Sequence, residues 1–410
     1  MLPKIFISAG EASGEHYGAL LIASLQQQLA PKGITAELFG MGGPRMAAAG
    51  LERIVRAEDM AVMGVTEVVR HLPRIYREYR KLLDAIRTRR PDIAVLIDFP
   101  DVHFKLAREL HRLGIPVVYF VSPQLWAWKK HRIELVRRFV DRMLVIFPFE
   151  EDYYRRHGIQ AEFVGHPLAE LPLPTIPREE FAANNGLHPE RTWIGLLPGS
   201  RMKEIQGNLP EMLRVAWRMS LPQTGAAHPN ETYDFVIPLA PTLTPEQRET
   251  VYRWAESGGG GLSIRVVDDA RATLLHARAS VVASGTATVE AALIGNPFVV
   301  VYRVSPITYA VARRVVDVPH VAMVNLIAGH RLVPELIQQD FTAAKIVQQL
   351  ENLLPDQPPR QSMMKQLAEI RAALRPHRQG GAEERGTIER VAAIVLDRMD
   401  NSPGEPGSVR

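Results

Sequence analysis

Short apolar runs alternate with longer amphipathic runs in the first half of the chain. An apolar run at 5–7 stops at Ser8, and positions 14–29 have the apolar spacing of a helix. Further strand-like runs follow at 92–97, 116–121 and 142–147, with a helix-like run at 104–113. Because such alternation is typical of βαβ units, we predict a mostly parallel sheet in this half.

The pattern restarts after a proline-rich segment at 167–177, which we interpret as a linker. Strand-like runs then occur at 193–197, 234–238, 263–267, 279–283 and 298–302. We therefore predict an α/β protein of two Rossmann-like, doubly wound domains that face a cleft. We place the first domain at 1–170 and the second at 171–344. The helices of about 345–398 are candidates to pack back on the first domain. We expect the Pro-, Gly- and Ser-rich end at 399–410 to be disordered.

Composition excludes several classes of protein. The chain has 410 residues and a formal net charge of only +4, and no compact basic block with interleaved aromatic residues is present. We therefore expect no nucleic acid partner. Cysteine is absent, which excludes disulfides, thiolate catalysis and cysteine zinc sites. No apolar run approaches the ~20 residues of a membrane-spanning helix, and the N-terminus lacks the pattern of a signal peptide, so we expect a cytoplasmic protein.

A turn of small residues at 283–286 separates a strand-like run from a helix-forming run that begins at Ala287. Free N–H groups and the helix dipole favour a phosphate at such a point. Glu290 lies four residues after Thr286, on the same helix face, where a carboxylate is suited to accept hydrogen bonds from a ribose. The alternative is an ordinary turn in which Thr286 caps the helix.

A second loop of this kind, 197–201, follows the first strand of the second half. Its backbone N–H groups and the Arg201 guanidinium suit a diphosphate, whereas the alternative is a solvated arginine. No two aspartates lie two residues apart, so the D-x-D metal motif of many glycosyltransferases is missing. We expect no metal, because Arg201 and a helix dipole can stabilise a leaving diphosphate.

Three loops of the first half carry candidate chemistry. Segment 8–16 has two glycines that permit close backbone approach, and Ser13 is suited to cap a helix, but it lacks the G-x-G-x-x-G pattern of dinucleotide sites. Asp98 follows a buried strand and is a candidate general base, although Asp98 or Asp101 can instead cap the next helix. Segment 122–129 carries two tryptophans that suit stacking on a sugar, or simple core packing. For His166 we expect a structural hydrogen bond.

Taken in order, these segments resemble the lipid-A-disaccharide synthases. The resemblance spans residues 5 to about 340 and rests on several modest motifs in the family's order. The matching segments are 8–14, 98–101, 122–128, 165–166, 196–201, 283–287 and 324–329. Glu15 stands where many members carry Asp, which keeps the charge.

The resemblance implies a GT-B fold and an inverting glycosyltransferase without a cofactor. It would join UDP-2,3-diacylglucosamine to 2,3-diacylglucosamine 1-phosphate, releasing UDP and forming the β-1,6-linked disaccharide of lipid A. The resemblance also implies roles for individual residues. Asp98, with Glu15 as its rival, would be the base; Ser200, Arg201, Gly285, Thr286, Glu290 and Asn325 would hold the UDP-sugar; and Ser13, Gly14, Ser122 and Trp126 would contact the acceptor.

The acylated substrates suggest a membrane partner. An apolar segment at 60–69 precedes Arg70, Arg74, Arg77, Arg80 and Lys81, with apolar residues at helical spacing up to Ile86. Such a segment can rest on the anionic cytoplasmic leaflet of the inner membrane as a peripheral contact. The alternative is a core-facing helix with a solvated basic face. The sequence leaves the oligomeric state open, a homodimer included.

Two other functions share parts of this pattern. A UDP-GlcNAc 2-epimerase has the same two-domain fold and a UDP site in its second half, but different acids in its first domain. A non-catalytic nucleotide-sugar binder would need Arg201 and Glu290 but not Asp98. Incubation with UDP-GlcNAc alone discriminates the epimerase, and substitution of Asp98 discriminates the binder.

Overall fold

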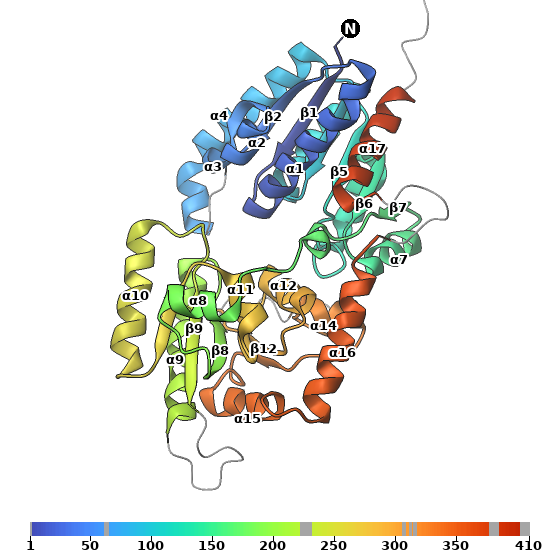
Figure 1. Ribbon diagram of the computed structural model, residues 1–410. Coiled ribbons are helices and arrows are strands. Elements are labelled where there is room, and N and C mark those ends of the chain that lie inside the picture. Colours follow the sequence, from blue (N-terminus) through green and yellow to red (C-terminus); the bar gives the residue numbers. More distant parts are fainter. Residues whose placement is uncertain are drawn as a thin grey trace, which may run out of the picture. The chain divides into compact units, whose positions relative to one another are not determined.

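The computed structural model describes residues 2–60, 65–221, 232–305, 309–310, 314, 318–376 and 385–401. The chain forms two compact units: Met1–Glu170 with Leu374–Arg410, and Leu171–Ala373 (Figure 1). Of the helices at about 345–398, only the last belongs to the first unit, because the chain returns to that unit at Leu374.

The first unit is built on a seven-stranded, all-parallel sheet of order β3-β2-β1-β4-β5-β6-β7. Its strands are β1 Lys4–Ala9, β2 Glu37–Gly42, β3 Glu52–Arg56, β4 Ile93–Ile97, β5 Val117–Phe120, β6 Arg142–Val145 and β7 Ala161–Phe163. Its helices are α1 Ala12–Leu29, α2 Pro44–Ala48, α3 Ala57–Met60, α4 Val65–Arg89, α5 Pro100–Arg112, α6 Ile133–Phe139, α7 Pro148–Arg156 and α17 Thr387–Asp400.

Helices cover the sheet of the first unit on both faces. All five residues of β4 are buried, as expected for a central parallel strand. One face packs on α4 and α5 in a single apolar cluster that includes Phe6, Leu82 and Leu106. On the other side α1 packs against α17, which brings the C-terminal helix beside the N-terminal one. Helix α17 continues to Asp400, so the predicted tail at 399–410 starts too early; residues 402–410 lie outside the described part.

The second unit repeats the design with a six-stranded parallel sheet of order β10-β9-β8-β11-β12-β13. Its strands are β8 Thr192–Leu197, β9 Tyr233–Pro238, β10 Ile264–Val267, β11 Ala279–Ala283, β12 Phe298–Tyr302 and β13 Glu335–Ile337. Its helices are α8 Arg178–Asn185, α9 Met202–Ser220, α10 Pro245–Gly259, α11 Ala270–His276, α12 Thr286–Ile294, α14 Met323–Ala328, α15 Ala343–Leu353 and α16 Pro358–Ala373.

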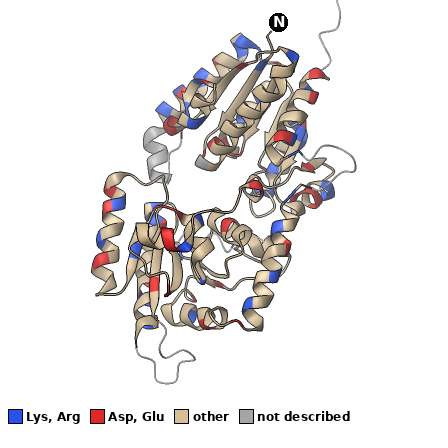
Figure 2. Ribbon diagram, in the orientation of Figure 1, with Lys and Arg blue, Asp and Glu red and all other residues tan. Residues whose placement is uncertain are grey.

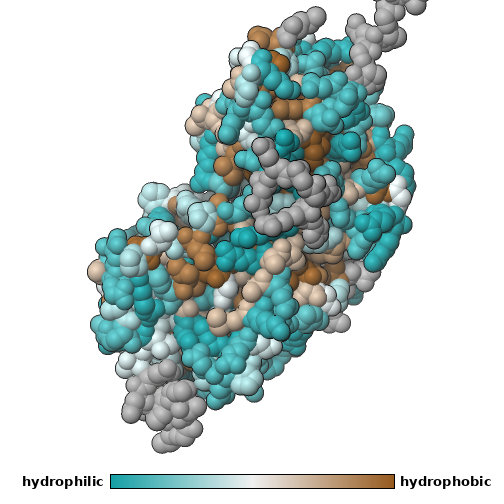
Figure 3. Space-filling view, turned by 45° about the vertical axis from the view of Figure 1, so that its right-hand side comes forward, coloured by the Kyte–Doolittle hydropathy of each residue, from teal (hydrophilic) through white to brown (hydrophobic). Residues whose placement is uncertain are grey.

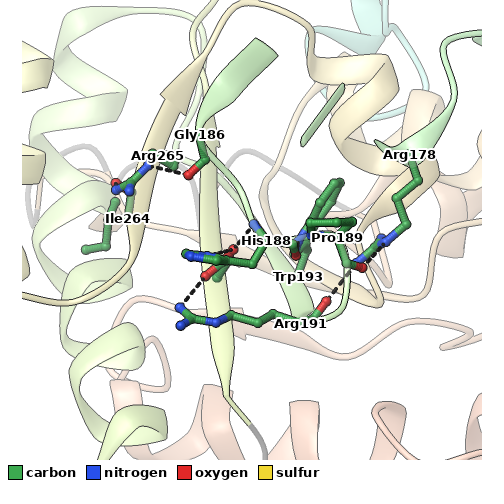
Figure 4. A network of polar contacts seen from close by, with 9 residues as sticks. Arg178, Gly186, His188, Pro189, Arg191, Trp193, Ile264 and Arg265 are labelled. Atoms are coloured by element: carbon green, nitrogen blue, oxygen red, sulfur yellow. Dashed lines mark hydrogen bonds and ion pairs between the residues drawn. The ribbon is translucent and has the colours of Figure 1, made fainter. Parts of the chain in front are cut away.

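A polar network ties the start of the second unit to its sheet (Figure 4). Asp234 is fully buried in β9, and its carboxylate accepts hydrogen bonds from the His188 N–H at 2.8 Å and from Arg191 at 3.1 Å. The Arg178 guanidinium lies 3.7 Å from the ring centre of Trp193 and donates to the His276 carbonyl. Because Trp193 lies near the beginning of β8, this network stabilises the sheet at the end opposite the carboxyl ends of the strands.

The point where the chain leaves and re-enters the first unit is held by backbone and side-chain bonds. The His166 N–H donates to the Leu374 carbonyl at 2.8 Å, and the Thr387 hydroxyl donates to Glu170 at 2.7 Å. Burial lowers the pKa of His166 to about 3, and its Nδ1 accepts the Leu168 N–H at 3.2 Å. His166 is therefore a neutral structural histidine, as predicted.

Candidate active site

The candidate loops gather at one kind of place in both units. In each sheet the order reverses beside the first strand, between β1 and β4 in the first unit and between β8 and β11 in the second. Ligands of open α/β sheets bind outside the carboxyl ends of the strands at this switch point. Segments 10–13 and 98–99 flank the first switch point, and segments 198–201 and 284–286 flank the second. Each unit therefore has one candidate ligand site formed by two neighbouring strand ends.

Asp98 lies directly after β4 and is half-buried. Burial raises the pKa of its carboxyl to about 7, and the negative charge of Glu11 adds to the rise. A hydrogen bond from the Phe99 N–H opposes this shift without cancelling it. A carboxyl with a pKa near the working pH is suited to accept a proton and release it again.

Neither aspartate of the 98–101 segment caps the helix that follows. The N-cap of α5 is Phe99, with no side-chain capping bond. Asp101 instead pairs with Arg132 and, at 3.4 Å, with Lys129. Burial raises the pKa of Asp101, but these two cations outweigh it and the net shift is downward. Asp101 is thus a charged partner of the 128–132 segment, and Asp98 is the acid of this strand end with a raised pKa.

Glu15 is occupied by the N-terminus of the short helix α2. Its Oε1 accepts the Arg45 N–H at 2.8 Å, and a Cβ at Gly43 would lie 2.2 Å from its carboxyl carbon. Ser13 is exposed at the start of α1, and Gly14 lies against β4, where a Cβ would be 3.5 Å from the Ile97 carbonyl oxygen. Ser13 and Gly14 therefore lie beside the strand end that carries Asp98, whereas the Glu15 carboxylate is used to hold α2.

The loop after β5 turns its predicted contact residues inward. Trp126 is only 9% exposed, and its indole N–H donates to Glu150 at 3.1 Å. The Ser122 hydroxyl is buried and lies 2.8 Å from the Tyr154 hydroxyl. Burial raises the pKa of Glu150 to about 8 despite the hydrogen bonds it accepts. The exposed aromatic residue of this loop is Trp128, at 40%, with the Lys129 ammonium 4.2 Å from its ring centre.

In the second unit the amides of the loop after β8 already have an acceptor. Glu204 Oε2 accepts the Ser200 N–H at 3.0 Å and the Arg201 N–H at 3.3 Å. Through these bonds the Glu204 side chain caps α9, and it engages the two N–H groups that we expected to bind a diphosphate. The Arg201 side chain is about half exposed, with its nearest acid, Glu204, at 3.8 Å. What this loop offers an anion is the Arg201 guanidinium.

The loop after β11 is more open. Gly285, not Thr286, is the N-cap of α12; its φ is +150°, and a Cβ there would meet nothing within 4 Å. Thr288 donates both its N–H and its hydroxyl to the Gly285 carbonyl, which fixes the turn. Thr286 is exposed at the first helical position. Burial raises the pKa of Glu290, which the charge of Arg271 partly offsets.

Asn325 is fully buried and its hydrogen-bonding capacity is used internally. Its amide donates to the Val333 carbonyl and to Glu335 Oε1 at 2.8 Å, and its Oδ1 accepts the N–H groups of Leu332 and Val333. Glu335 in turn accepts the Ala322 N–H at 2.9 Å. Asn325 therefore shapes the segment around α14 rather than presenting its amide to a ligand.

The apolar face of α4 belongs to the core of the first unit. Leu82, Leu83 and Ile86 are buried there, and basic residues follow the outer side of the helix (Figure 2). Of the predicted apolar segment 60–69, Met60 is buried, residues 61–64 lie outside the described part, and the side chains of 65–69 are not described. Over its described side chains, then, α4 matches the alternative of a core-facing helix with a solvated basic face.

Among the described residues, no helix is long and apolar enough to cross a bilayer. The face of the molecule shown in Figure 3 is mostly hydrophilic, with apolar residues in smaller separate areas.

Four residues near the candidate site carry contacts that sequence patterns did not single out. They are Tyr119 and His103, which bond to the Asp98 carbonyl, and Glu150 and Glu204, which hold the loops of Trp126 and Arg201. A glutamate three residues after an N-cap is a known capping signal, so Glu204 was open to prediction. The other three contacts join residues 5 to 24 positions apart across different elements, and no spacing rule indicates them.

Comparison with known proteins shows which family this chain resembles. The model of a family described as lipid-A-disaccharide synthetase matches residues 5–388. A lipid-A-disaccharide synthase of Acidobacterium capsulatum is 60% identical over 405 residues, covering 97% of each chain.

Two solved structures show the fold alone. The calicheamicin glycosyltransferase CalG4 is similar with a TM-score of 0.58 and 17% identity, over 98% of this chain and 99% of that chain. A putative UDP-N-acetylglucosamine 2-epimerase from Listeria monocytogenes gives a TM-score of 0.58 at 13% identity, over 100% of both chains. The predicted GT-B fold, with two Rossmann-like domains, is confirmed. Because a transferase and an epimerase match equally well, the fold does not separate the two activities.

Proposed function

The chain belongs to the lipid-A-disaccharide synthase family, and we propose that Asp98 is the general base of the condensation that this family performs. The protein is a GT-B glycosyltransferase of lipid A biosynthesis. Its reaction joins UDP-2,3-diacylglucosamine to 2,3-diacylglucosamine 1-phosphate and yields the β-1,6-linked disaccharide 1-phosphate and UDP.

The bond changes define what the site must supply. The acceptor hydroxyl oxygen forms a bond to the anomeric carbon of the donor, while the bond from that carbon to the β-phosphate oxygen of UDP breaks. The hydroxyl proton goes to a base on the side opposite the leaving group, and negative charge develops on the departing diphosphate. One base and one anion-stabilising group are therefore sufficient.

The observation that carries the assignment of the base is the environment of Asp98. This carboxyl lies at the switch point of the first unit and has a pKa raised to about 7 by burial, so it can take up a proton near neutral pH. Its rival Glu15 accepts the Arg45 N–H and holds the N-terminus of α2. A carboxylate with that structural bond is less free to approach an acceptor.

We assign the donor to the switch point of the second unit. Arg201 presents an exposed guanidinium there, and Gly285 and Thr286 offer an open helix N-terminus to the diphosphate. Ser200 orders the loop through the bond from its N–H to Glu204. Glu290, on the same helix as Thr286, receives the ribose. Asn325 acts indirectly by holding the segment around α14.

The acceptor side uses the first unit. Ser13 and Gly14 border the strand end that carries Asp98, and the loop after β5 adds an aromatic surface. Since Ser122 and Trp126 are buried, we assign them to shaping this loop, with Trp128 as its exposed contact.

Because both substrates carry acyl chains, we assign the protein to the cytoplasmic leaflet of the inner membrane as a peripheral contact. The basic outer side of α4 supports this assignment by charge: Arg77 is 70% exposed, and Arg80 is exposed too. Its apolar side is packed in the core, so the contact we propose is electrostatic rather than an insertion.

The test replaces Asp98 by asparagine, which keeps size and removes the basic carboxylate. Turnover of the acylated substrates, followed by mass spectrometry of the disaccharide, should fall by roughly 10²-fold or more, while UDP affinity stays near wild type. Asp101→Asn, three residues away and paired with Arg132, is the matched control and should retain most turnover. Turnover near wild type in Asp98→Asn would remove Asp98 as the base.

A further inference from the structure

Asp98 and the residue after it have an unusual backbone. Both Asp98 and Phe99 have a φ of +51°, in the left-handed region that non-glycine residues rarely occupy. Two such residues in succession are costly and persist only where surrounding contacts hold them. Because this turn sets the direction in which the Asp98 side chain leaves the strand end, the contacts that hold the turn also determine where the carboxylate lies.

Three hydrogen bonds fix the Asp98 peptide groups. The Asp98 N–H donates to the Phe120 carbonyl at 3.0 Å. The Asp98 carbonyl accepts the Tyr119 hydroxyl at 2.7 Å and His103 Nδ1–H at 2.5 Å. Both donors are fully buried, so neither bond competes with water. All hydrogen-bonding groups of this peptide backbone are thereby engaged with protein.

The direction of each bond follows from chemistry. A backbone carbonyl only accepts, so His103 Nδ1 must carry the proton. Its Nε2 lies 2.8 Å from the Ser8 hydroxyl and therefore accepts from it. Burial lowers the pKa of His103 to about 3, which keeps the ring neutral and this tautomer in place. Ser8 in β1 thus orients His103 in α5, and His103 orients the Asp98 carbonyl.

The next residue is held by shape. The Phe99 ring lies so close to Gly10 that a Cβ there would be 2.4 Å from a ring carbon. The ring centre of Phe99 is 5.7 Å from that of His103, edge to face. The loop after β1, helix α5 and strand β5 therefore all contact this one turn.

We propose that Tyr119 and His103, the latter oriented by Ser8, are positioning residues that fix the Asp98 turn so that its carboxylate points at the acceptor hydroxyl. The inference rests on the proposed role of Asp98 as base. None of the three side chains needs to touch substrate; each acts through the Asp98 backbone. Loss of one bond lets the turn relax, and a general base displaced by a fraction of an ångström loses rate rather than substrate affinity.

The test is a double-mutant cycle between Tyr119→Phe and Asp98→Asn. Tyr119→Phe removes one hydroxyl and keeps the ring; kcat should fall roughly tenfold, with KM for both substrates and UDP affinity within about twofold of wild type. In the Asp98→Asn background the same change should cost less than about twofold, because the carboxylate it positions is already gone. Tyr79→Phe, in the same apolar cluster, is the matched control and should leave kcat unchanged.

The outcomes separate the two proposals. Equal slowing by Tyr119→Phe in the wild-type and the Asp98→Asn backgrounds, or a change confined to KM, would overturn positioning while leaving the base assignment standing. Near-normal turnover of Asp98→Asn alone would refute the base assignment itself. Should Tyr119→Phe lower the melting temperature so far that kinetics are unusable, Ser8→Ala runs the same cycle through His103 and is judged by the same criteria.

Discussion

Glu15 accepts the backbone N–H of Arg45 at 2.8 Å, so the acid that rivals Asp98 as base is the capping group of another helix. Its carboxylate also fills the space beside Gly43, where no Cβ fits. An acid in this position contributes to stability through the start of α2, whereas the hydrogen bond from the Phe99 N–H leaves the pKa of Asp98 raised to about 7.

Glu15→Gln should therefore affect stability more than chemistry. The amide oxygen still accepts the Arg45 N–H but loses the charge at the helix end, which costs on the order of 0.5–1 kcal/mol in the free energy of unfolding. Turnover should fall far less than in Asp98→Asn. Thermal unfolding and steady-state kinetics on the two variants check this, and a turnover loss in Glu15→Gln that exceeds the loss in Asp98→Asn would reverse the assignment.

The raised pKa of Asp98 predicts how rate and stability depend on pH. Since the carboxyl has a pKa of about 7 in the folded protein and an ordinary value of 3.8, turnover should rise with pH through about 7 as the base loses its proton. The folded state holds this proton more tightly than the unfolded state. Stability from this group is therefore complete below about pH 4 and is lost progressively as pH rises to about 7.

Asp98→Asn removes that dependence. The difference in the free energy of unfolding between Asp98→Asn and wild type should shift in favour of the variant as pH rises from 5 to 8. The shift should be on the order of 2 kcal/mol, while turnover is lost at both pH values. Denaturant unfolding of both proteins at the two pH values measures the difference. If the stability of Asp98→Asn differed from wild type by the same amount at both pH values, the Asp98 carboxyl would have an ordinary pKa in the folded state.

The parts of the fold that sequence predicted are those with continuous apolar runs. Strands β4, β8, β11 and β12 are buried on both faces, so their runs are unbroken and their ends were located within a residue or so. Strand β2 contains two glycines, β3 is partly exposed, and β7 and β13 have three residues each. Their strand character comes from pairing with neighbours, which local patterns do not report.

The candidate site shows the same division. The position of Asp98 was predictable because loops after parallel strands carry function, and the position of Arg201 for the same reason. Whether a group is already engaged was only partly predictable. The Ser200 amide is bound by Glu204, four residues on, which a local capping rule indicates. The Asn325 side chain is bound by the segment that follows α14, and no spacing rule indicates that contact.

Turnover should not require a divalent metal. Arg201 offers a fixed positive charge at the donor switch point, so excess EDTA should leave the rate unchanged within roughly twofold, and Arg201→Ala should lower kcat by about 10²-fold or more. Product formation measured with EDTA, and again after adding Mg²⁺ or Mn²⁺, tests this. Loss of activity in EDTA with recovery on adding metal would refute the leaving-group role of Arg201.

The membrane contact can be tested through the basic side of α4. Arg74 pairs with Asp59, so its charge is left unchanged in this test. Arg77, which is 70% exposed and lies 3.6 Å from Glu78, and the exposed Arg80 are reversed instead. Arg77→Glu with Arg80→Glu should weaken binding to anionic vesicles at least about tenfold. Turnover on a short-chain, water-soluble acceptor should change little, because neither residue lies at a strand end.

The matched control reverses two exposed arginines on other helices, Arg155 and Arg253, and so makes the same change in net charge. If α4 is the contact, only the α4 variant should lose vesicle sedimentation and turnover of vesicle-presented substrate. Raised salt should weaken wild-type binding as well, because the attraction is screened over about 10 Å at 0.1 M salt. An equal loss of vesicle sedimentation in both variants would assign the attraction to overall charge. Binding that does not respond to salt would place the lipid contact on an apolar surface elsewhere.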